Sequence, residues 1–580
     1  MALDSAKAAA VRIDPALVPF SRYGSYLAVS RDPWDTPLGE ALYLRSCHGK
    51  PQTARPELFR LDLLAGRRKV PADVLATPSV LRMQAGPGRE VQLCLTGTET
   101  VLVRGRGIGL QMEVPPQSGR IVYPTEDGRW VLVPASGPNN YVVACVKGAL
   151  QVDAPWKLPA GRGSARCPRM RFRIRPDADG ASEARVDAFV SCLPAPEAVA
   201  FDDALAEAER DFADWLKCMP TPQYGSAADW ARAAYIDWAS VVPPGGLLRR
   251  PAMLMSKAHM RSVWSWDHCF NAMALSYGHP RLAWDQLMLL ADFQDGNGFM
   301  PDSVNDARAS WHHGKPPVHG WALAFCMRRR PRFFTRPRVE RAYRWLVRWT
   351  NWWLGNRIWR GLGLPYYTHG NDSGWDNATI FDVGSPTASP DLAAHLSVQM
   401  DVLAKLAKRL GKPRAAKQWR TRSDAMLGAL LAKLWRGDRF VGIHCPSGRD
   451  IECESLITSL PIVLGRRLPP AVIRALVRRI RRCAAAHGLA TEDPASDQYD
   501  GNFHAYWRGS AWAPSTMLVV DGLRSAGAER LSRRIARAAC RAMAKCRYRE
   551  NWDPLTGGGR MELAYTWTSS VYLILAHEFV

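Results

Sequence analysis

Hydrophobic residues recur with two different periods along this chain of 580 residues, one in its first third and another in the rest. In its first third, short segments rich in β-branched residues, some alternating between apolar and polar positions, are separated by clusters of Gly, Pro, Asn and Asp. This pattern is typical of strands joined by turns. The clearest segments are residues 91–96, 100–104, 130–133, 141–146, 170–174 and 184–190. We therefore predict an antiparallel β-sandwich domain over residues 1–200.

A helical period replaces this pattern after residue 200. In residues 201–217, Leu205, Phe212 and Leu216 fall on one stripe of a helix. Beyond it, about ten to twelve helical stretches alternate with aromatic-rich or Gly/Pro-rich loops. Because paired helices of this kind can wind into a toroid, we predict a mainly α chain whose residues 201–580 form a helical toroid. Its inner helices should be apolar and its outer helices rich in arginine.

Length and composition narrow the class of protein. A chain this long favours two domains over a single hydrophobic core. No window is apolar enough for a membrane helix, and the N-terminus lacks the charged start and apolar run of a secretory signal. The 13 cysteines have no CxxC spacing, which favours reduced thiols over disulfides or a zinc site. We predict a cytoplasmic protein with no membrane partner, no bound metal and no cofactor.

The formal net charge of +23 leaves two interpretations open. Most of the excess lies in residues 328–332, 466–482 and 533–549. Within the second run, Leu476 and Ile480 belong to an apolar helical stripe that is flanked by arginines. Such runs are either solvated outer faces of packed helices or a binding surface for a polyanion. Because no nucleic-acid motif accompanies them, we predict no nucleic-acid partner.

Two carboxylates lie in settings that suit catalysis. Asp376 stands in the segment SGWDN, where a glycine allows close backbone approach and Trp375 supplies an apolar wall that raises a carboxyl pKa. Glu550 precedes a Gly-rich loop that extends to residue 559. Each also has a simpler interpretation, Asp376 as a turn or helix-cap residue and Glu550 as half of a surface ion pair. Glu562, just beyond the glycines, is a rival to Glu550.

Two further segments could recognise a sugar. Trp266 and Asp267 stand at an expected helix start, where an indole can stack on a sugar face and a carboxylate can accept two hydroxyl hydrogen bonds. Arg508 lies between aromatic residues and could bind hydroxyls or a carboxylate. Both arrangements also occur as ordinary core packing and helix capping.

The order of these segments resembles a known enzyme family. The motifs are WSWDHCFNAMAL, FQDGNGFMPDS, HGNDSGWDN, YWRGSAW and ENWDPLTGGG followed by AYTWTSS. Together they resemble the catalytic-domain motifs of glycoside hydrolase family 63 and its trehalase and mannosylglycerate-hydrolase-like relatives, over approximately residues 200 to 580. The resemblance implies an (α/α)6 toroid with an inverting glycosidase site, preceded by a β-sandwich.

The resemblance also implies roles for individual residues. The family's general acid falls on Asp376 and its general base on Glu550. Substrate-binding roles fall on Trp266, Asp267, Gln294, Trp375, Asn377, Arg508, Trp512 and Trp567. Four positions depart from the family. Asp372 stands where relatives usually have Glu, Asp302 where His or Asn is common, and Ser510 and Ala511 where Pro and a β-branched residue are frequent.

We therefore expect an inverting, exo-acting glycoside hydrolase that cleaves a terminal α-linked glucosyl or related hexosyl unit from a small saccharide or glycoside. In such a site the acid is protonated, the base is ionised, and the two carboxyl groups lie roughly 6.5 to 9.5 Å apart around a water molecule. The oligomeric state stays open.

Three alternatives remain. A glycoside phosphorylase of similar architecture would use phosphate instead of water and need no base. A non-catalytic carbohydrate- or polyanion-binding protein would use the basic faces. A polysaccharide lyase would need a base near an arginine, for which His504 or Tyr506 beside Arg508 could serve.

Overall fold

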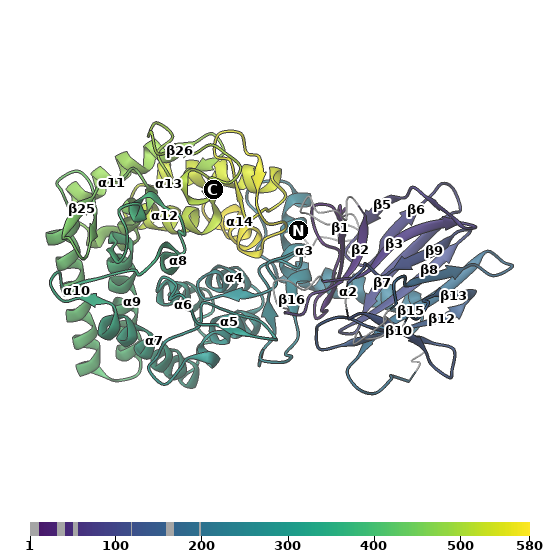
Figure 1. The fold of residues 1–580 in the computed structure, drawn as a ribbon. Helices are drawn as coiled ribbons and strands as arrows, with labels where there is room; N and C mark the ends of the chain where they lie inside the picture. The colour runs from purple at the N-terminus through teal and green to yellow at the C-terminus, as the bar shows by residue number, and fades with distance from the viewer. Residues whose placement is uncertain (1–10, 32–40, 50–55, 118, 158–166, 196–198) are drawn as a thin grey trace.

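The protein consists of a β-rich N-terminal region and a helical C-terminal region (Figure 1). The computed structural model describes residues 1–580 except 1–10, 32–40, 50–55, 118, 158–166 and 196–198. Among the described residues, no helix combines the length and the apolar character needed to cross a membrane.

Two antiparallel sheets make up the β-rich region. In the described residues, one sheet has the order β1 (Leu27–Arg31), β2 (Leu42–Ser46), β3 (Glu57–Ala65), β9 (Gly109–Glu113), β14 (Arg171–Arg175) and β13 (Ala149–Asp153), with β4 (Arg68–Val70) beside β3. The other has the order β10 (Ile121–Pro124), β11 (Trp130–Val133), β12 (Asn140–Lys147), β15 (Ala181–Phe189), β8 (Thr100–Arg106), β7 (Glu90–Thr96), β6 (Leu81–Gln84) and β5 (Asp73–Ala76).

The strand predictions are confirmed where they were made. Each of the six predicted segments overlaps a strand, namely β7, β8, β11, β12, β14 and β15. Alternation places apolar side chains on one face of a sheet, as in β6, where Leu81 and Met83 are buried while Arg82 and Gln84 are exposed. Both sheets contribute their buried residues to one hydrophobic core.

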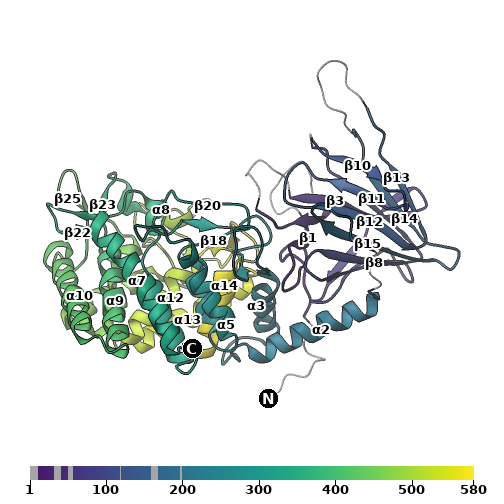
Figure 2. The same ribbon diagram turned by 90° about the horizontal axis from the view of Figure 1, so that it is seen from below.

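A single long helix connects the two regions. Helix α2 (Phe201–Cys218) contacts strands β7 and β8 of the β-rich region and helix α3 (Ala227–Ser240) of the helical region. Figure 2 shows it running from one region to the other. The predicted stripe is confirmed, since Phe212 and Leu216 are buried and Leu205 is half-buried.

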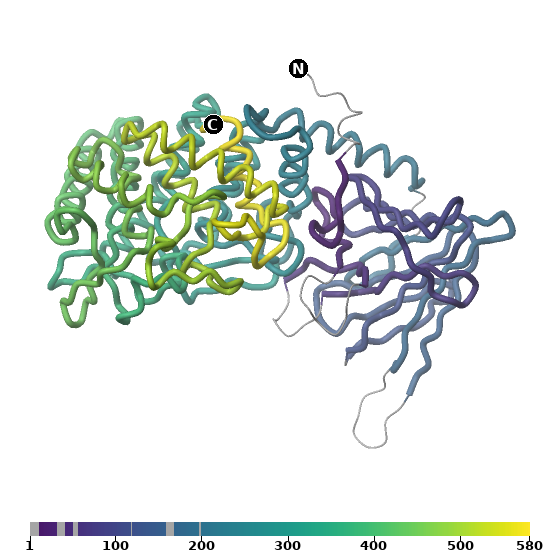
Figure 3. Tube along the Cα trace, turned by 90° about the horizontal axis from the view of Figure 1, so that it is seen from above, coloured from purple at the N-terminus to yellow at the C-terminus, as the bar shows by residue number. Residues whose placement is uncertain are grey.

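The helical region contains a closed ring of neighbouring elements. In the described residues, the further helices longer than three residues are α4 (Asp267–Leu275), α5 (Pro280–Leu289), α6 (His319–Arg329), α7 (Arg336–Asn356), α8 (Gly370–Ser373), α9 (Pro390–Arg409), α10 (Pro413–Leu434), η3 (Leu456–Arg467), α11 (Pro470–Cys483), α12 (Ala513–Ser525), α13 (Glu529–Lys545) and α14 (Thr566–Glu578). Contacts run from α4 through α6, α9, η3, α12 and α14 back to α4. Figure 3 shows the C-terminal segment, in yellow, on the side that faces the β-rich region.

Burial separates the helices of this ring from those around it. Every residue of α4 is buried, as is α14 from Thr566 to Ala576. By contrast, α11 buries Leu476 and Ile480 but exposes Arg474, Arg478 and Arg481. The predicted apolar inner and Arg-rich outer helices are therefore confirmed in these elements, and the arginines of α11 form a solvated face.

Polar side chains join the two regions. The Lys257 ammonium group donates to the Ser21 hydroxyl at 3.0 Å and to the carbonyls of Arg22 and Ser25 at 3.3 and 2.5 Å. The Arg261 guanidinium donates to the carbonyls of Ser46 and His48. Because these cations are satisfied by backbone oxygens across the boundary, the two regions hold one another in place.

A histidine at the same boundary is held between two acids. His48 Nδ1 lies 2.7 Å from Asp306 Oδ2, and its Nε2 lies 2.8 Å from Glu99 Oε1. Although burial opposes its charge, hydrogen bonds to the two carboxylates raise the pKa of His48 from 6.5 to about 9. A protonated His48 therefore bridges the β-rich region and the loop that carries Asp306.

This arrangement predicts a pH-dependent stability. Because the folded pKa of His48 is raised, its contribution is fully present below pH 6.5 and is lost as the pH rises through about 9. At about 1.4 kcal/mol per pH unit, the contribution is about 3 kcal/mol. Replacement His48→Gln should remove this part of the pH dependence of the free energy of unfolding, measured by urea denaturation between pH 6 and pH 10.

The matched control is His504→Gln, which alters an exposed histidine. This variant keeps His48 and both of its carboxylate partners, so the part of the pH dependence assigned to His48 should persist in it. If His48→Gln leaves the slope of stability against pH unchanged, the ion pairs at the boundary contribute nothing measurable.

Candidate active site

Asp376 lies in a tightly folded loop. Helix α8 ends at Gly374, which adopts a left-handed φ of +72°, and the Trp375 amide then donates to the Ser373 hydroxyl at 3.0 Å. Gly370 is required by the same turn, since a Cβ atom there would lie 2.0 Å from the Asp376 carbonyl oxygen. Asp376 is partly exposed, and its carboxylate makes no hydrogen bond with another described residue. It is therefore free to meet a ligand.

Asp372 fastens this loop to its neighbours. Its carboxylate accepts hydrogen bonds from the backbone amides of Thr368 at 2.7 Å and Gly314 at 3.1 Å, and it pairs with Arg357 at 3.3 Å. The side chain is fully buried. Although Asp372 is one methylene shorter than the glutamate expected here, it reaches these partners and anchors the Asp376 loop.

Glu550 enters the site from a small three-stranded sheet. It directly precedes strand β29 (Asn551–Trp552), which pairs with β28 (Ala511–Trp512) and β30 (Gly559–Arg560). The Glu550 amide donates to the Glu562 carbonyl at 2.9 Å, and the Glu562 amide lies 3.3 Å from Glu550 Oε2. The Tyr506 hydroxyl donates to Glu550 Oε1 at 3.3 Å. Two donors from different segments therefore fix the orientation of this carboxyl group.

Backbone strain concentrates around Glu550. In the described part of the chain, the residues other than glycine with positive φ are Tyr506, Arg547, Tyr548, Met561 and Ala564. All of them lie in the two segments that contact Glu550 or flank it. Such conformations persist only where surrounding structure enforces them, and they are common at functional sites. The positions of Tyr506 and Glu550 are thus enforced by strongly constrained loops.

The electrostatics of Glu550 differ from the sequence-based expectation. Burial is the largest cause that raises its pKa, to about 8, and the charges of Glu562, Asp267 and Asp376 raise it further. Glu550 was expected to be ionised near neutral pH, whereas its burial favours the protonated form in the free protein. The reason is that its side chain is 5% exposed and stands beside another buried carboxyl group.

Asp267 and Lys315 belong to the same electrostatic site. Burial raises the pKa of Asp267 to about 7, against the charge of Lys315 and a 3.1 Å hydrogen bond donated by the Tyr565 hydroxyl. Burial also raises the pKa of Asp376. The positive charge of Lys315 lowers this pKa, and the negative charge of Asp302 raises it. Lys315 in turn pairs with Asp302 at 3.3 Å. A group of coupled carboxyl groups thus shares one buried cation.

The predicted tryptophans lie together in a single aromatic cluster. Trp266 contacts Trp567 with ring centroids 5.7 Å apart, and Trp507 connects Trp375 at 4.6 Å to Trp512 at 3.9 Å. Trp266, Trp375, Trp512 and Trp567 are each at most 3% exposed. Their rings therefore pack mainly on one another, and Trp567 also donates from Nε1 to the Glu550 carbonyl at 3.1 Å.

Other predicted residues have internal partners. The Asn377 side chain accepts from the Trp507 amide at 2.8 Å and donates to the Ala505 carbonyl at 3.2 Å, which uses both ends of its amide. Arg508 donates to the Asn377 carbonyl and pairs with Asp382. These contacts join the Asp376 loop to the segment that carries Tyr506.

Gln294 lies in a different loop. Its amide nitrogen donates to the carbonyls of Gly298 at 2.8 Å and Trp345 at 3.3 Å. Among the described residues, no hydrogen bond or ring contact connects it with Asp376 or Glu550.

Several residues of the site were not predicted from the sequence. Tyr506 appeared only as a possible base, and Tyr565, Lys315 and Trp507 were given no role. A signal existed for Tyr506 and Trp507, which stand in YWRGSAW, and for Tyr565 in AYTWTSS. Lys315 lies in no motif, and only the fold brings it to the carboxyl groups.

Comparison with known families places the site in context. The model of the mannosylglycerate hydrolase MGH1-like glycoside hydrolase domain matches residues 260–568, a range that includes both Asp376 and Glu550. A mannosylglycerate hydrolase of Rubrobacter radiotolerans is 25% identical over 406 residues, which is 54% of this chain and 90% of that protein.

Solved structures share the fold. The GH63 mannosylglycerate hydrolase from Thermus thermophilus, in complex with Tris, superposes with a TM-score of 0.52 and 20% identity over 59% of this chain and 98% of that one. A bacterial glucoamylase in complex with acarbose gives a TM-score of 0.63 at 10% identity and covers 97% of this chain and 93% of that one. The second likeness extends through the β-rich region.

Gly374 provides a test of the loop geometry. A Cβ atom at this position would lie 2.7 Å from Cε2 and Cζ2 of Trp266, in addition to the strain of a left-handed φ. We expect Gly374→Ala to lower the free energy of unfolding by about 1–3 kcal/mol from overpacking, plus about 1–2 kcal/mol from backbone strain. Urea denaturation followed by tryptophan fluorescence measures the sum.

Gly411→Ala is the matched control, because Gly411 has a φ of +74° and no atom within 4 Å of the added Cβ. It should show the strain alone. Equal losses in the two variants would mean that the loop and Trp266 separate at little cost.

Proposed function

This chain belongs to the mannosylglycerate hydrolase MGH1-like glycoside hydrolases of glycoside hydrolase family 63, and we propose that it releases a terminal α-linked hexosyl unit from a small glycoside with inversion. The resemblance found in the sequence is thereby confirmed at the level of the family and of glycoside hydrolase activity. Asp376 is proposed as the general acid and Glu550 as the general base.

One observation carries the assignment of the two acids. The charges of Asp376 and Asp267 both raise the pKa of Glu550, so three carboxyl groups from distant segments act on one another. Coupled acids with raised pKa values are typical of catalytic sites rather than of structural ion pairs. Asp376 and Glu550 also differ in their surroundings, since the first has no hydrogen-bond partner among the described residues and the second is held by Tyr506.

The mechanism follows from these differences. Burial raises the pKa of Asp376, which favours its protonated form, and the proton would be given to the glycosidic oxygen as the bond breaks. Glu550, once ionised, would take a proton from the water that attacks the opposite face of the sugar. The Tyr506 hydroxyl stabilises the ionised form of Glu550 because it donates to that carboxylate. Asp267, beside Trp266, is proposed to accept hydrogen bonds from sugar hydroxyls.

The other predicted residues receive narrower roles. We propose that Trp266, Trp375, Trp512 and Trp567 act as the apolar wall that keeps water from the carboxyl groups. Asn377 and Arg508 are proposed to position the Asp376 loop against Tyr506, given their hydrogen bonds to one another and to Trp507. Gln294 is proposed to bind substrate from the neighbouring loop through its carbonyl oxygen.

The sugar is proposed to be glucosyl or mannosyl. The sequence motifs favoured an α-glucosyl unit, whereas the related proteins are named as mannosylglycerate hydrolases. Lys315 adds a cation to the site, which suits an anionic aglycone such as glycerate. Mannosylglycerate and glucosylglycerate are therefore the first substrates to assay, followed by α-linked disaccharides.

We also propose the finer architecture. The ring of contacts through α4, α6, α9, η3, α12 and α14 supports an (α/α)6 toroid over residues 201–580, and the two sheets that share a core support a β-sandwich over residues 1–200. A cytoplasmic location is proposed because the 13 cysteines are free, as is typical of reducing compartments.

The alternatives from the sequence are less well supported. A glycoside phosphorylase needs no general base, whereas the Tyr506 hydroxyl and the Glu562 amide both donate hydrogen bonds that orient the Glu550 carboxyl group. Membership of a hydrolase family disfavours both a binding protein without activity and a lyase. Tyr506, the possible lyase base, donates to Glu550 instead.

Replacement of either acid tests the function. Asp376→Asn and Glu550→Gln should each lower the rate of hydrolysis by about 10²–10⁴-fold, the usual contribution of a general acid or base. Proton NMR of the reaction gives both the rate and the anomer that forms first. An α-linked substrate should yield the β anomer.

The control is Asp237→Asn. Asp237 is another fully buried acid whose pKa burial raises to about 8, and it bonds Ser569 and Ser570 instead of the site residues. It should retain activity. Release of the α anomer first, or full activity in either test variant, would contradict the proposal.

The pH profile provides a second test. Because the base must be ionised, kcat/KM should fall as the pH drops through the pKa of Glu550, which burial and Glu562 raise to about 8. Replacement Glu562→Gln removes the neighbouring charge, so the acidic limb should move to lower pH. Initial rates measured from pH 5 to pH 10 locate the limb.

Asp237→Asn should leave the limb where it is, since Asp237 is not among the charges that act on Glu550. An acidic limb at the ordinary pKa of glutamate, unmoved by Glu562→Gln, would show that Glu550 is not the base.

A further inference from the structure

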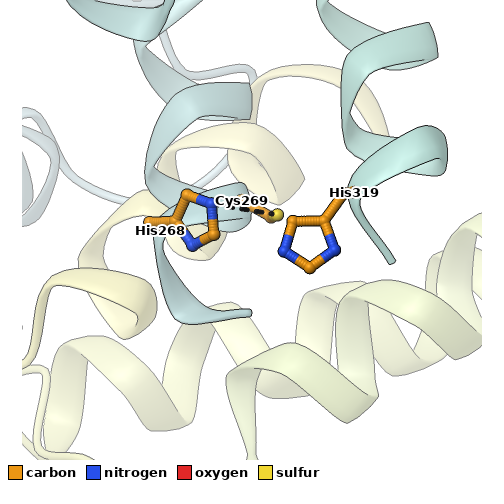
Figure 4. Close-up of side chains that lie close together, drawn as sticks. All are labelled: His268, Cys269 and His319. Carbon is orange, nitrogen blue, oxygen red and sulfur yellow. Dashed lines mark hydrogen bonds between the residues drawn. The ribbon is translucent and has the colours of Figure 1, made fainter. Parts of the chain in front are cut away.

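Two histidines and a cysteine converge inside the helical region (Figure 4). His268 and Cys269 lie in the first turn of α4, and His319 is the first residue of α6. Each has no exposed surface. One donor atom from each residue lies within 4.8 Å of the other two. The three side chains therefore form a compact N₂S group between adjacent helices of the ring.

The ring nitrogens of His319 form no hydrogen bond with any described residue, although the ring is fully buried. The Ser265 carbonyl lies near the ring and slightly favours its protonated form, but without hydrogen-bond geometry. Because buried polar atoms are satisfied in the great majority of cases, two such nitrogens on one ring point to a ligand.

His268 is held in the form that binds metals. Its Nδ1 lies 3.0 Å from the Trp264 carbonyl oxygen, so Nδ1 carries the hydrogen and the lone pair remains on Nε2. Nε2 lies 3.8 Å from Cys269 Sγ. A backbone carbonyl that fixes the tautomer of a ligating histidine is the usual support of such a ligand.

The spacing and the donor types suit zinc. With Zn–S of about 2.3 Å and Zn–N of about 2.0 Å, a tetrahedral angle separates the sulfur and nitrogen by about 3.6 Å, close to the separation of Sγ and Nε2. Neutral imidazole nitrogens and a cysteine sulfur are donor types that Zn²⁺ binds in proteins, and the cysteine binds as the thiolate.

A hydrogen bond within the cluster is a simpler interpretation, but it accounts for fewer of the unpartnered atoms. Cys269 could donate a weak S–H hydrogen bond to His268 Nε2, which would satisfy these two residues. It would leave both nitrogens of His319 without partners. A metal ion would use one donor atom from each of the three side chains, including one of the two unpartnered nitrogens of His319.

We propose that His268, Cys269 and His319 bind one zinc ion that joins the N-termini of helices α4 and α6. The ion would link two helices that pack together, and these three buried side chains would supply three of the four ligands of a tetrahedral zinc ion. It would also fix the start of α4, where Asp267 precedes His268. The proposal does not depend on the reaction of the active site.

Metal analysis of the full chain tests this site. Protein expressed with zinc in the medium and dialysed against buffer should contain one zinc per chain by inductively coupled plasma mass spectrometry. Burial should prevent a chelator from removing the zinc until the protein is unfolded. Cys269→Ala and His319→Phe should each lose the bound zinc completely.

Cys326→Ala is the matched control. Cys326 is also a buried thiol of α6, but its Sγ donates to the Ala272 carbonyl at 3.5 Å and it is not one of the three donors. This variant should keep one zinc per chain. Zinc-free unmodified protein, or full zinc content in Cys269→Ala, would overturn the proposal.

A spectroscopic measurement covers the case in which the ligand variants fail to fold. The unmodified chain expressed with cobalt(II) should show a thiolate-to-cobalt charge-transfer band in the near ultraviolet, and Cys326→Ala should retain it. The absence of this band from the folded, cobalt-supplemented chain would overturn the proposal without any ligand variant.

Discussion

The burial of the Glu550 carboxyl group beside Glu562 is the constraint on which the site depends. Two backbone amides exchange hydrogen bonds between these residues, so both acids are held in place where little water can reach them. A low-dielectric setting makes each charge act strongly on the next, which is why Asp267 and Asp376 influence Glu550 from other segments. The strained backbone around Tyr506 and residues 547–564 maintains this placement.

The β-rich region takes part in the same arrangement through a short segment. Arg261 donates to carbonyls at the end of β2, and His259 donates its amide to Glu562 Oε1 at 2.9 Å. Ser256 donates to the carbonyl of Leu563. Residues 256–261 therefore connect the boundary between the regions with the immediate neighbour of Glu550.

Much of the fold could be predicted from the sequence because it follows from local periods. Alternation identified strands such as β7 and β8, and the 3.6-residue period identified α2 and the solvated face of α11. Short-range motifs also suggested Asp376 and Glu550 as candidates for the acid and the base. What could not be predicted depends on contacts between distant segments. No local signal shows that the Asn377 side-chain amide bonds to the backbone of the Tyr506 segment. Nor does one show that His319 lies beside His268, which is 51 positions earlier in the chain. The pKa of Glu550 was misjudged for the same reason, since its burial arises only in the folded chain.

The contacts of Lys257 define what a self-sufficient fragment of this protein would contain. Its ammonium group is buried and finds its oxygen partners at Ser21, Arg22 and Ser25, close to the beginning of the described chain. A fragment that starts at the linker helix would remove all three of these oxygen partners, and water would have to replace them around the Lys257 cation. Residues 21–25 therefore pack as part of the helical region, and excision of that region would have to carry them along.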